Sequence, residues 1–366
     1  MLRAGIVGLA NVGKTTLFNA LTAQMAALAA NYPFASNKSN VGVVPVPDER
    51  LEPLARIVKT NVIIPATVEF VDIPGLVRGS SKGEGLGNQF LTNIRESDTV
   101  VQVVRCFESE EVVHVEGSVN PRRDIETIQI ELALADLASV ERRRERTQKV
   151  AKSGDKKARA ELELLDKLQP ALEEFRPASS VALDDDEKKM LRDFFLLTTK
   201  PTIYAANVDE ATLADPGASA HVRAVREIAE AEGNECVVIC AQLEADLVAL
   251  PPEERSEYLE TLGVRSSGVD SLIRGAYHLL GLMSFLTAGE KEVRAWTIPQ
   301  GTRAPQAAGV IHSDIERGFI RAEIISYDAL TRAGSYAAAR EQGLLRLEGK
   351  DYVMREGDVV HFRFNV

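Results

Sequence analysis

The chain has few cysteines, no long apolar run and no surplus of positive charge. Its three cysteines, Cys106, Cys236 and Cys240, are odd in number and match no metal-ligand spacing. The sequence therefore predicts reduced thiols in a cytoplasmic protein. No apolar run approaches the roughly 20 residues that a membrane-spanning helix needs. A glycine-containing loop begins at Gly8 and leaves no room for a signal peptide before it, so we expect no membrane partner.

The charge balance is acidic, with a formal net charge of −11 at pH 7. Nucleic acid is therefore not attracted by the molecule as a whole, and any RNA contact must use a local basic face. A composition that is 45% hydrophobic and 27% charged is ordinary for a soluble globular protein. The length of 366 residues predicts two or three domains with ample buried core.

The stretch from Gly8 to Thr15 is a complete match to G-x-x-x-x-G-K-[ST]. It follows an apolar run at 4–7 that predicts a buried strand, and it precedes 16–21, whose apolar spacing predicts a helix. This context favours a phosphate-binding loop over a plain glycine-containing turn. Lys14 would reach the β- and γ-phosphates, and the Thr15 hydroxyl would hold Mg²⁺. The candidate nucleotide-binding residues here are Asn11, Val12, Gly13, Lys14, Thr15 and Thr16.

A second motif, Asp72-Ile73-Pro74-Gly75, ends the next strand-like stretch. Asp72 could bind Mg²⁺ through water, and the Gly75 N–H could meet the γ-phosphate, which is the physical basis of a nucleotide switch. The turn-rich segment 31–40 predicts either a first switch loop or a plain surface connection. Glycines at 79, 83, 85 and 87 predict a mobile segment after the second motif.

The apolar period changes to three- and four-residue steps from Ile125. One apolar stripe covers 125–135 and another covers 158–172, on either side of the turn-like 153–155. This pattern predicts an antiparallel helical hairpin or short coiled coil. Basic residues gather between the stripes and indicate either a solvated helix face or a contact with a phosphate backbone. The candidate ribosome or RNA contacts are Arg142, Arg143, Arg144, Lys149, Lys152, Lys156 and Lys157.

The base-reading motif departs from the guanine pattern Asn-Lys-x-Asp, because the chain has Asn207-Val208-Asp209-Glu210. Val208 removes the lysine, and Glu210 puts its carboxylate one methylene farther out, so the preference for guanine should be largely lost. Asn207 and nearby backbone could instead read the N6/N7 edge of adenine. Alternatively, Asp209 or Glu210 is only a helix N-cap and the base is read elsewhere. The candidate residues on this side are Asn207, Val208, Glu210, Cys240, Ala241 and Gln242.

Strand-like and helix-like stretches alternate on both sides of the helical insertion, which predicts an α/β protein with a mainly parallel sheet. Toward the C-terminal end, short strand patterns at 292–298, 309–312, 322–325 and 358–364 alternate with turns. They predict a small, separate α+β module.

With these residues in hand, the chain resembles the YchF/Obg-like ATPase family over essentially its full length. The resemblance rests on the motifs Gly8–Thr15, Asp72–Leu76, Lys82–Leu91, Asn207–Glu210 and Val293–Ile298. It implies a P-loop nucleotide domain formed by 1–124 and 200–281, a helical or coiled-coil insertion at 125–199, and a C-terminal TGS module of β-grasp type at 282–366. The family is described as ATP-preferring and ribosome-associated.

The resemblance also implies residue roles. Leu76 stands where related switch proteins have a water-positioning Gln, and the family gives that role to a histidine that matches His114. His114 and Lys14 are thus the catalytic candidates. Asn11 matches the loop Asn of potassium-stimulated relatives, which makes K⁺ a candidate cofactor beside Mg²⁺. Ser36 stands near the first-switch Thr that completes the Mg²⁺ shell, so the candidate metal ligands are Thr15, Asp72 and Ser36.

Three departures from the family pattern are Ala10 and Pro74, in place of Pro and Ala, and Ser36-Asn37-Lys38-Ser39 in place of Thr-Ile-Glu-Pro. We expect a monomeric, ribosome-associated ATPase that acts as a slow molecular switch in translation or the stress response. The competing hypotheses are a guanine-preferring translational GTPase and a nucleotide-gated RNA or ribosome adaptor with negligible turnover.

Overall fold

The computed structural model describes residues 2–28, 40–75, 86–264 and 267–365, which divide into two compact units. Unit 1 comprises Met1–Val43 and Glu69–Leu272, and unit 2 comprises Val44–Val68 and Ile273–Val366. Within the described residues, no helix combines the length and apolarity that crossing a membrane requires.

Unit 1 is built on a six-stranded sheet in the order β2-β4-β1-β5-β6-β7. Strand β1 pairs in parallel with β4 and β5, and β5, β6 and β7 continue in parallel. Every residue of β5 is buried, as expected for a central strand covered on both faces. The strands are β1 (Arg3–Val7), β2 (Val41–Pro45), β4 (Thr67–Asp72), β5 (Thr99–Arg105), β6 (Thr202–Asn207) and β7 (Glu235–Ile239).

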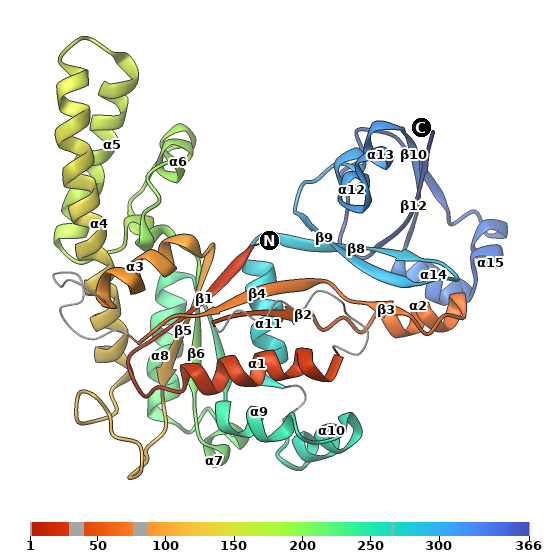
Figure 1. Ribbon diagram of the computed structural model, residues 1–366, viewed down its shortest axis with the longest axis horizontal. Helices are drawn as coiled ribbons and strands as arrows, with labels where there is room; N and C mark the ends of the chain where they lie inside the picture. Colours follow the sequence, from red (N-terminus) through yellow and green to blue (C-terminus); the bar gives the residue numbers. More distant parts are fainter. Residues whose placement is uncertain (1, 29–39, 76–85, 265–266, 366) are drawn as a thin grey trace. The chain divides into compact units, whose positions relative to one another are not determined.

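Helices connect these parallel strands (Figure 1). Helix α8 packs against β6 and β7, and its ends are set by the Ser219 N-cap and by Gly233 in the left-handed conformation. A core cluster joins apolar residues of β5, β6 and α8. The connecting helices are α1 (Lys14–Leu28), α3 (Leu86–Glu96), α7 (Glu210–Ala214) and α8 (Ala220–Glu232). After the last strand, β7, come α9 (Ala241–Leu247), α10 (Pro252–Thr261) and α11 (Gly268–Leu279), and α11 continues into unit 2 from Ile273.

Two long helices, α4 (Pro121–Ala151) and α5 (Lys156–Glu173), lie side by side (Figure 1). Asn120 caps α4 and Asp155 caps α5 through side-chain oxygens. The stripe on α4 serves two cores, because Ile125 packs with the strands while Val140 packs with the leucines of α5. Short elements complete this region: η3 (Ala178–Ser180), α6 (Asp185–Arg192) and η4 (Leu197–Thr199).

Asp136, fully buried on α4, ties α4 to η4. Its carboxylate accepts the backbone N–H groups of Leu197 and Thr198, both at 2.8 Å, and the Thr198 hydroxyl at 2.7 Å. The charged composition of α4 does not reveal this role, since the partners lie about 60 residues away in sequence.

Unit 2 contains a mixed sheet in the order β11-β10-β12-β8-β9-β3. The strands β8, β10 and β12 and the helix α12 surround one apolar core. The strands are β3 (Ile63–Ile64), β8 (Leu282–Ala288), β9 (Val293–Pro299), β10 (Phe319–Ser326), β11 (Arg346–Glu348) and β12 (Asp358–Phe364). The helices are α2 (Leu51–Val58), α12 (Ala304–Ile311), α13 (Ser313–Arg317), α14 (Tyr327–Ala333) and α15 (Tyr336–Glu341).

One predicted strand is wrong. Residues 309–311 belong to helix α12, although Val310 and Ile311 favour strands. Pro305 in the first helical turn and the fully buried Ala304, Ala307 and Ala308 fix a helix there, so packing overrides local propensity.

Candidate functional site

The loop after β1 folds around two residues in left-handed backbone conformations, Asn11 at φ 62° and Gly13 at φ 98°. A Cβ built on Gly13 would lie 2.3 Å from Nδ2 of Asn207, so only glycine fits there. Helix α1 begins directly at Lys14. The sequence thus produces a tight loop that leads directly into a helix start, the arrangement that phosphate sites use.

Lys14 lies inside this loop with a side chain that is 7% exposed. Its Nζ donates to the Leu9 carbonyl at 2.5 Å. Burial lowers the pKa of Lys14 to about 8, and the nearby Asp72 carboxylate opposes that shift. The buried ammonium is thus held by a carbonyl of its own loop, at the position where a phosphate oxygen would be the stronger partner.

Thr15 and Asp72 meet across the site. The Thr15 hydroxyl donates to Oδ2 of Asp72 at 3.1 Å, and burial raises the pKa of the Asp72 carboxyl. The described residues hold no cluster of three or more His, Cys, Asp or Glu that could bind a metal by itself. One carboxylate and one hydroxyl suit Mg²⁺ instead, because that ion usually takes few protein ligands and fills its shell with water and phosphate oxygens.

Gly75, the glycine of the second motif, lies against the loop. A Cβ built on it would be 3.0 Å from Nζ of Lys14 and 3.2 Å from the Ala10 nitrogen. The two motifs predicted from the sequence are therefore brought together, although they are about 60 residues apart along the chain. Ser36 and Leu76 lie outside the described residues.

The Asn207 side chain links the loop after β1 to the start of helix α9. Its Nδ2 donates to the Val12 carbonyl at 2.9 Å and its Oδ1 accepts the Ala241 N–H at 3.0 Å, with the residue 4% exposed. This amide therefore positions the phosphate loop against α9, rather than standing open toward a base. Val208 is 2% exposed and belongs to the core cluster of β5, β6 and α8, so only its backbone is available to a nucleotide.

The two carboxylates after Asn207 are both engaged. Asp209 caps α7 by accepting the Thr212 N–H at 2.8 Å, and Oε1 of Glu210 accepts the Tyr258 hydroxyl at 2.9 Å. Cys240 is buried at the start of α9 next to Ala241. Gln242 is exposed, and its amide donates to Asp246. Thr16 lies half-buried in the first turn of α1.

His114 is held away from solvent. It is 7% exposed, its Nε2 bonds to Oδ2 of Asp124 at 2.9 Å, and its Nδ1 accepts the Glu116 N–H at 3.1 Å. The histidine loop also contacts the phosphate loop, because Nδ2 of Asn11 donates to the Val113 carbonyl at 3.2 Å. His114 therefore lies beside the site with both ring nitrogens occupied by protein.

Sequence reasoning missed Asp124, the partner of His114. It lies in the first turn of α4, is 3% exposed and also pairs with Arg123 through Oδ1 at 3.0 Å. It missed Arg105 as well, which is 1% exposed with Nη1 unpartnered. An acidic residue in a first helical turn is common, so the sequence carries no signal that separates Asp124 from an ordinary dipole partner.

The seven basic candidates on α4 and α5 divide into two groups. Arg143 bonds to Glu161 at 2.8 Å and lies over the Phe194 ring, and Arg144 pairs with Asp166 at 2.6 Å. Arg142 donates to the Ala138 carbonyl of its own helix. The remaining four are exposed and form no ion pair within the part of the chain that is described: Lys149, Lys152, Lys156 and Lys157.

Two sequence families match the chain. Residues 3–140 match a family described as 50S ribosome-binding GTPase, and residues 282–365 match the YchF-GTPase C-terminal family, described as a protein of unknown function. These matches cover the phosphate loop and most of unit 2, respectively.

Curated relatives match over their whole length. Proteins called Ribosome-binding ATPase YchF are 51% identical in Bacillus subtilis, over 100% of both chains, and 53% identical in Pasteurella multocida, over 100% of this chain and 99% of that protein. The Escherichia coli O157:H7 protein of the same name is 52% identical over the same shares. The solved structure of the Schizosaccharomyces pombe YchF GTPase is 36% identical, has a TM-score of 0.89, and covers 99% of this chain and 97% of its own.

Proposed function

We propose a function from the premise that this chain belongs to the YchF family. It binds ATP at the Gly8–Thr15 loop and hydrolyses it slowly to ADP and phosphate. In this way it acts as a ribosome-associated switch in translation or the stress response. The observation that carries this proposal is the buried Lys14 ammonium, which donates to a loop carbonyl at 2.5 Å, beside the Thr15–Asp72 pair. A phosphate-binding loop with a lysine and an oxygen pair in these positions is built for a nucleoside triphosphate.

Each residue of the site has a separate role in binding the nucleotide or its metal ion. The loop amides and Lys14 hold the phosphates, while Thr15 and Asp72 hold Mg²⁺, with Ser36 as the first-switch ligand. Bound Mg²⁺ would neutralise phosphate charge. Gly75 would report the γ-phosphate through its N–H. Asn11 keeps its amide nitrogen on the Val113 carbonyl, which leaves its oxygen for K⁺.

The preference for adenine is supported by the carboxylates near Asn207. Guanine selection needs a carboxylate that accepts both N1–H and the N2 amino group. Asp209 caps α7, and Glu210 accepts the Tyr258 hydroxyl. Asn207 is also committed, in part to the Ala241 N–H, so we assign the reading of adenine to the remaining backbone groups around Cys240, Ala241 and Gln242.

We propose that Asp124 holds His114 in an inactive position, an arrangement that we call the latch. The Asp124 carboxylate and the Glu116 N–H occupy both ring nitrogens, so the resting protein has no free nitrogen with which to orient water. Turnover would require that His114 leave Asp124 and approach the phosphate site, a short path since Val113 already touches Asn11. A slow basal ATPase follows from this arrangement.

Ribosome contact is assigned to the four unpaired lysines on α4 and α5, Lys149, Lys152, Lys156 and Lys157. A basic cluster on a chain of net charge −11 favours a phosphate backbone as the partner. Arg142, Arg143 and Arg144 contribute less, since protein groups already hold each of them.

The remaining assignments follow the family resemblance. We propose that 1–124 and 200–281 form the nucleotide domain, apart from 44–68, which group with unit 2 in the structure. We also propose that 125–199 form a coiled-coil insertion and that 282–366 form a TGS module of β-grasp type. We further propose that the protein is monomeric and cytoplasmic.

The test is calorimetric titration with ATP and with GTP in Mg²⁺ buffer, with and without K⁺, followed by steady-state hydrolysis for wild type and His114→Ala. We expect selective ATP binding, slow hydrolysis and loss of turnover in the variant. A second candidate, a GTPase, is favoured by the carboxylate that Glu210 retains at the base-reading position. Tight, selective GTP binding would decide for it, and binding without turnover would decide for a ribosome adaptor.

A further inference from the structure

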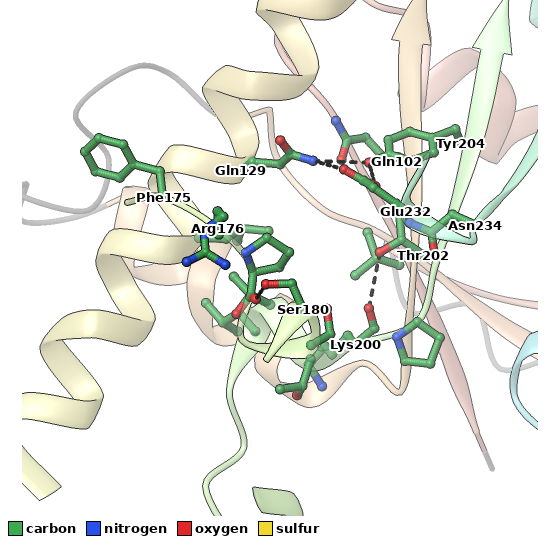
Figure 2. A pocket seen from close by; sticks show the side chains of 18 of the residues that line it. Gln102, Gln129, Phe175, Arg176, Ser180, Lys200, Thr202, Tyr204, Glu232 and Asn234 are labelled. Carbon is green, nitrogen blue, oxygen red and sulfur yellow. Dashed lines mark hydrogen bonds between the residues drawn. The ribbon is translucent and has the colours of Figure 1, made fainter. Parts of the chain in front are cut away.

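A cavity of about 450 Å³ lies in unit 1, between the N-terminal half of α4 and the strands β5 and β6. Figure 2 shows its walls, which come from α4, the segment after α5, the segment around η4, the starts of β5 and β6, and the end of α8. Val100 and Thr202, near the amino ends of the parallel strands β5 and β6, line it. The phosphate loop follows the carboxyl end of β1, so this cavity is a separate site. Its volume is in the range of small-molecule sites.

Glu232 places a fixed negative charge on one wall. Its Oε1 accepts from the Gln129 amide at 2.5 Å, and its Oε2 accepts from the Tyr204 hydroxyl at 2.6 Å and the Asn234 amide at 2.9 Å. All three donors are neutral. Glu232 forms no ion pair among the residues that are described, and Oε1 keeps an open acceptor position. A carboxylate oriented in this way, but not neutralised, favours a cationic ligand group.

Arg176 places a positive charge on the other side of the cavity (Figure 2). Its Nε and Nη2 bond to Glu174 at 2.9 and 2.8 Å, which leaves Nη1 for a ligand. Lys200, the other basic residue of the lining, is already used, because its Nζ donates to the carbonyls of Arg95 and Ser97. Among the described lining residues, Nη1 of Arg176 is therefore the cationic donor left for a ligand, on a guanidinium that also pairs with Glu174.

Leu132, Pro177 and Phe175 add apolar surface to the lining of the cavity. Phe175 is 45% exposed and has φ 57°, a left-handed conformation that is costly for an aromatic residue. Strained, exposed residues of this kind are concentrated at ligand sites. The cavity thus offers an anion, a cation and an apolar wall within one small volume.

We propose that this cavity binds a small zwitterion of the free amino-acid class, with its ammonium group on Glu232, its carboxylate on Arg176 and its side chain on the apolar wall. The opposite charges select against simple cations and simple anions, since either would meet one repulsive wall. The site does not depend on the nucleotide chemistry, so it stands or falls apart from the ATPase assignment.

The test is calorimetry and ligand-observed NMR on the full chain with each of the standard free amino acids. At least one should bind, and its N-acetyl and carboxamide derivatives should each bind at least about tenfold more weakly, the loss expected for one charge-assisted hydrogen bond. Glu232→Gln and Arg176→Gln should weaken the same amino acid to a similar extent. Glu227→Gln is the matched control, because Glu227 lies on the same helix but pairs with Arg122 outside the cavity lining.

Unchanged ATP binding by each variant would verify that it is folded. The derivative series uses the wild-type chain and so decides the question even where a variant fails to fold. Absence of binding by every amino acid, equal binding of the blocked derivatives, or equal loss in Glu227→Gln would each overturn the proposal.

Discussion

The contact between His114 and Asp124 yields the sharpest prediction. Asp124→Asn keeps the size of the side chain but removes the charge that holds Nε2 of His114 at 2.9 Å, in a place where both side chains are 4% exposed. A hydrogen bond to a charged group contributes about 1.5–3 kcal/mol, against about 1 kcal/mol for a neutral one. The variant should therefore release His114 more easily by about 1 kcal/mol, which corresponds to roughly a fivefold larger released population.

If release limits basal turnover, kcat without ribosomes should rise about fivefold in Asp124→Asn, and stimulation by ribosomes should fall by the same factor. The assay is steady-state ATP hydrolysis with and without 70S ribosomes. His114→Ala in the Asp124→Asn background should return the rate to that of His114→Ala alone. Glu126→Gln is the matched control, because Glu126 lies on the same turn of α4 but is exposed.

The opposite result would refute the latch. A fall in basal kcat, with the ribosome-stimulated ratio unchanged, would mean that Asp124 orients an active His114, as carboxylates do in catalytic triads. An unchanged rate in both conditions would mean that release of His114 is not limiting.

Three further predictions follow from the same geometry. Gly13→Ala should reduce ATP affinity by at least about tenfold in calorimetry, since the new methyl group must displace the Asn207 amide that lies 2.3 Å away. The pKa of Lys14 is about 8, and bound phosphates favour its charged form, so ATP binding should take up a proton as the pH rises through 8. Above pH 8 the affinity for ATP should fall by up to about tenfold per pH unit. Calorimetry in buffers of different ionisation heat measures the proton uptake, and an absence of uptake would contradict a buried lysine. Glu substitutions at Lys149, Lys152, Lys156 and Lys157 should abolish co-sedimentation with ribosomes, whereas Arg144→Gln, at a residue already paired with Asp166, should leave it unchanged.

The sequence predicts well what is local. The Gly8–Thr15 motif predicts its own backbone conformation, because it includes both the glycine with positive φ at position 13 and the residue Lys14 at which the helix begins. The parallel sheet also follows from alternating strand and helix patterns, and the α/β P-loop fold is confirmed by the full-length match to a solved structure. For the loop, the deciding information lies within a few residues.

What the sequence does not reveal depends on residues that are distant along the chain. Asn207 fits a base-reading motif, yet its amide is used on Val12, 195 positions away. Residues 44–68 group with unit 2, and nothing in their composition predicts that assignment. The charge run on α4 does not reveal that Arg143 and Arg144 are paired, while Lys149 forms no ion pair with the residues that the structure describes. Composition counts charges, but only the fold decides which of them are left for a partner.

The position of Asp124 on α4 suggests how ribosome binding at one end of this helix could affect His114 at the other. Asp124 lies in the first turn of α4, and the unpaired Lys149 lies in the last turn of the same 31-residue helix, which spans about 46 Å. Because backbone hydrogen bonds run along the whole helix, a ribosome that bound and tilted the basic end would also move the carboxylate at the other end. Asp124 holds His114, so such a movement would loosen the histidine without any contact between ribosome and nucleotide. The same helix would thus join the proposed ribosome contact to the catalytic candidate, and the coupling would depend on one hydrogen bond of 2.9 Å.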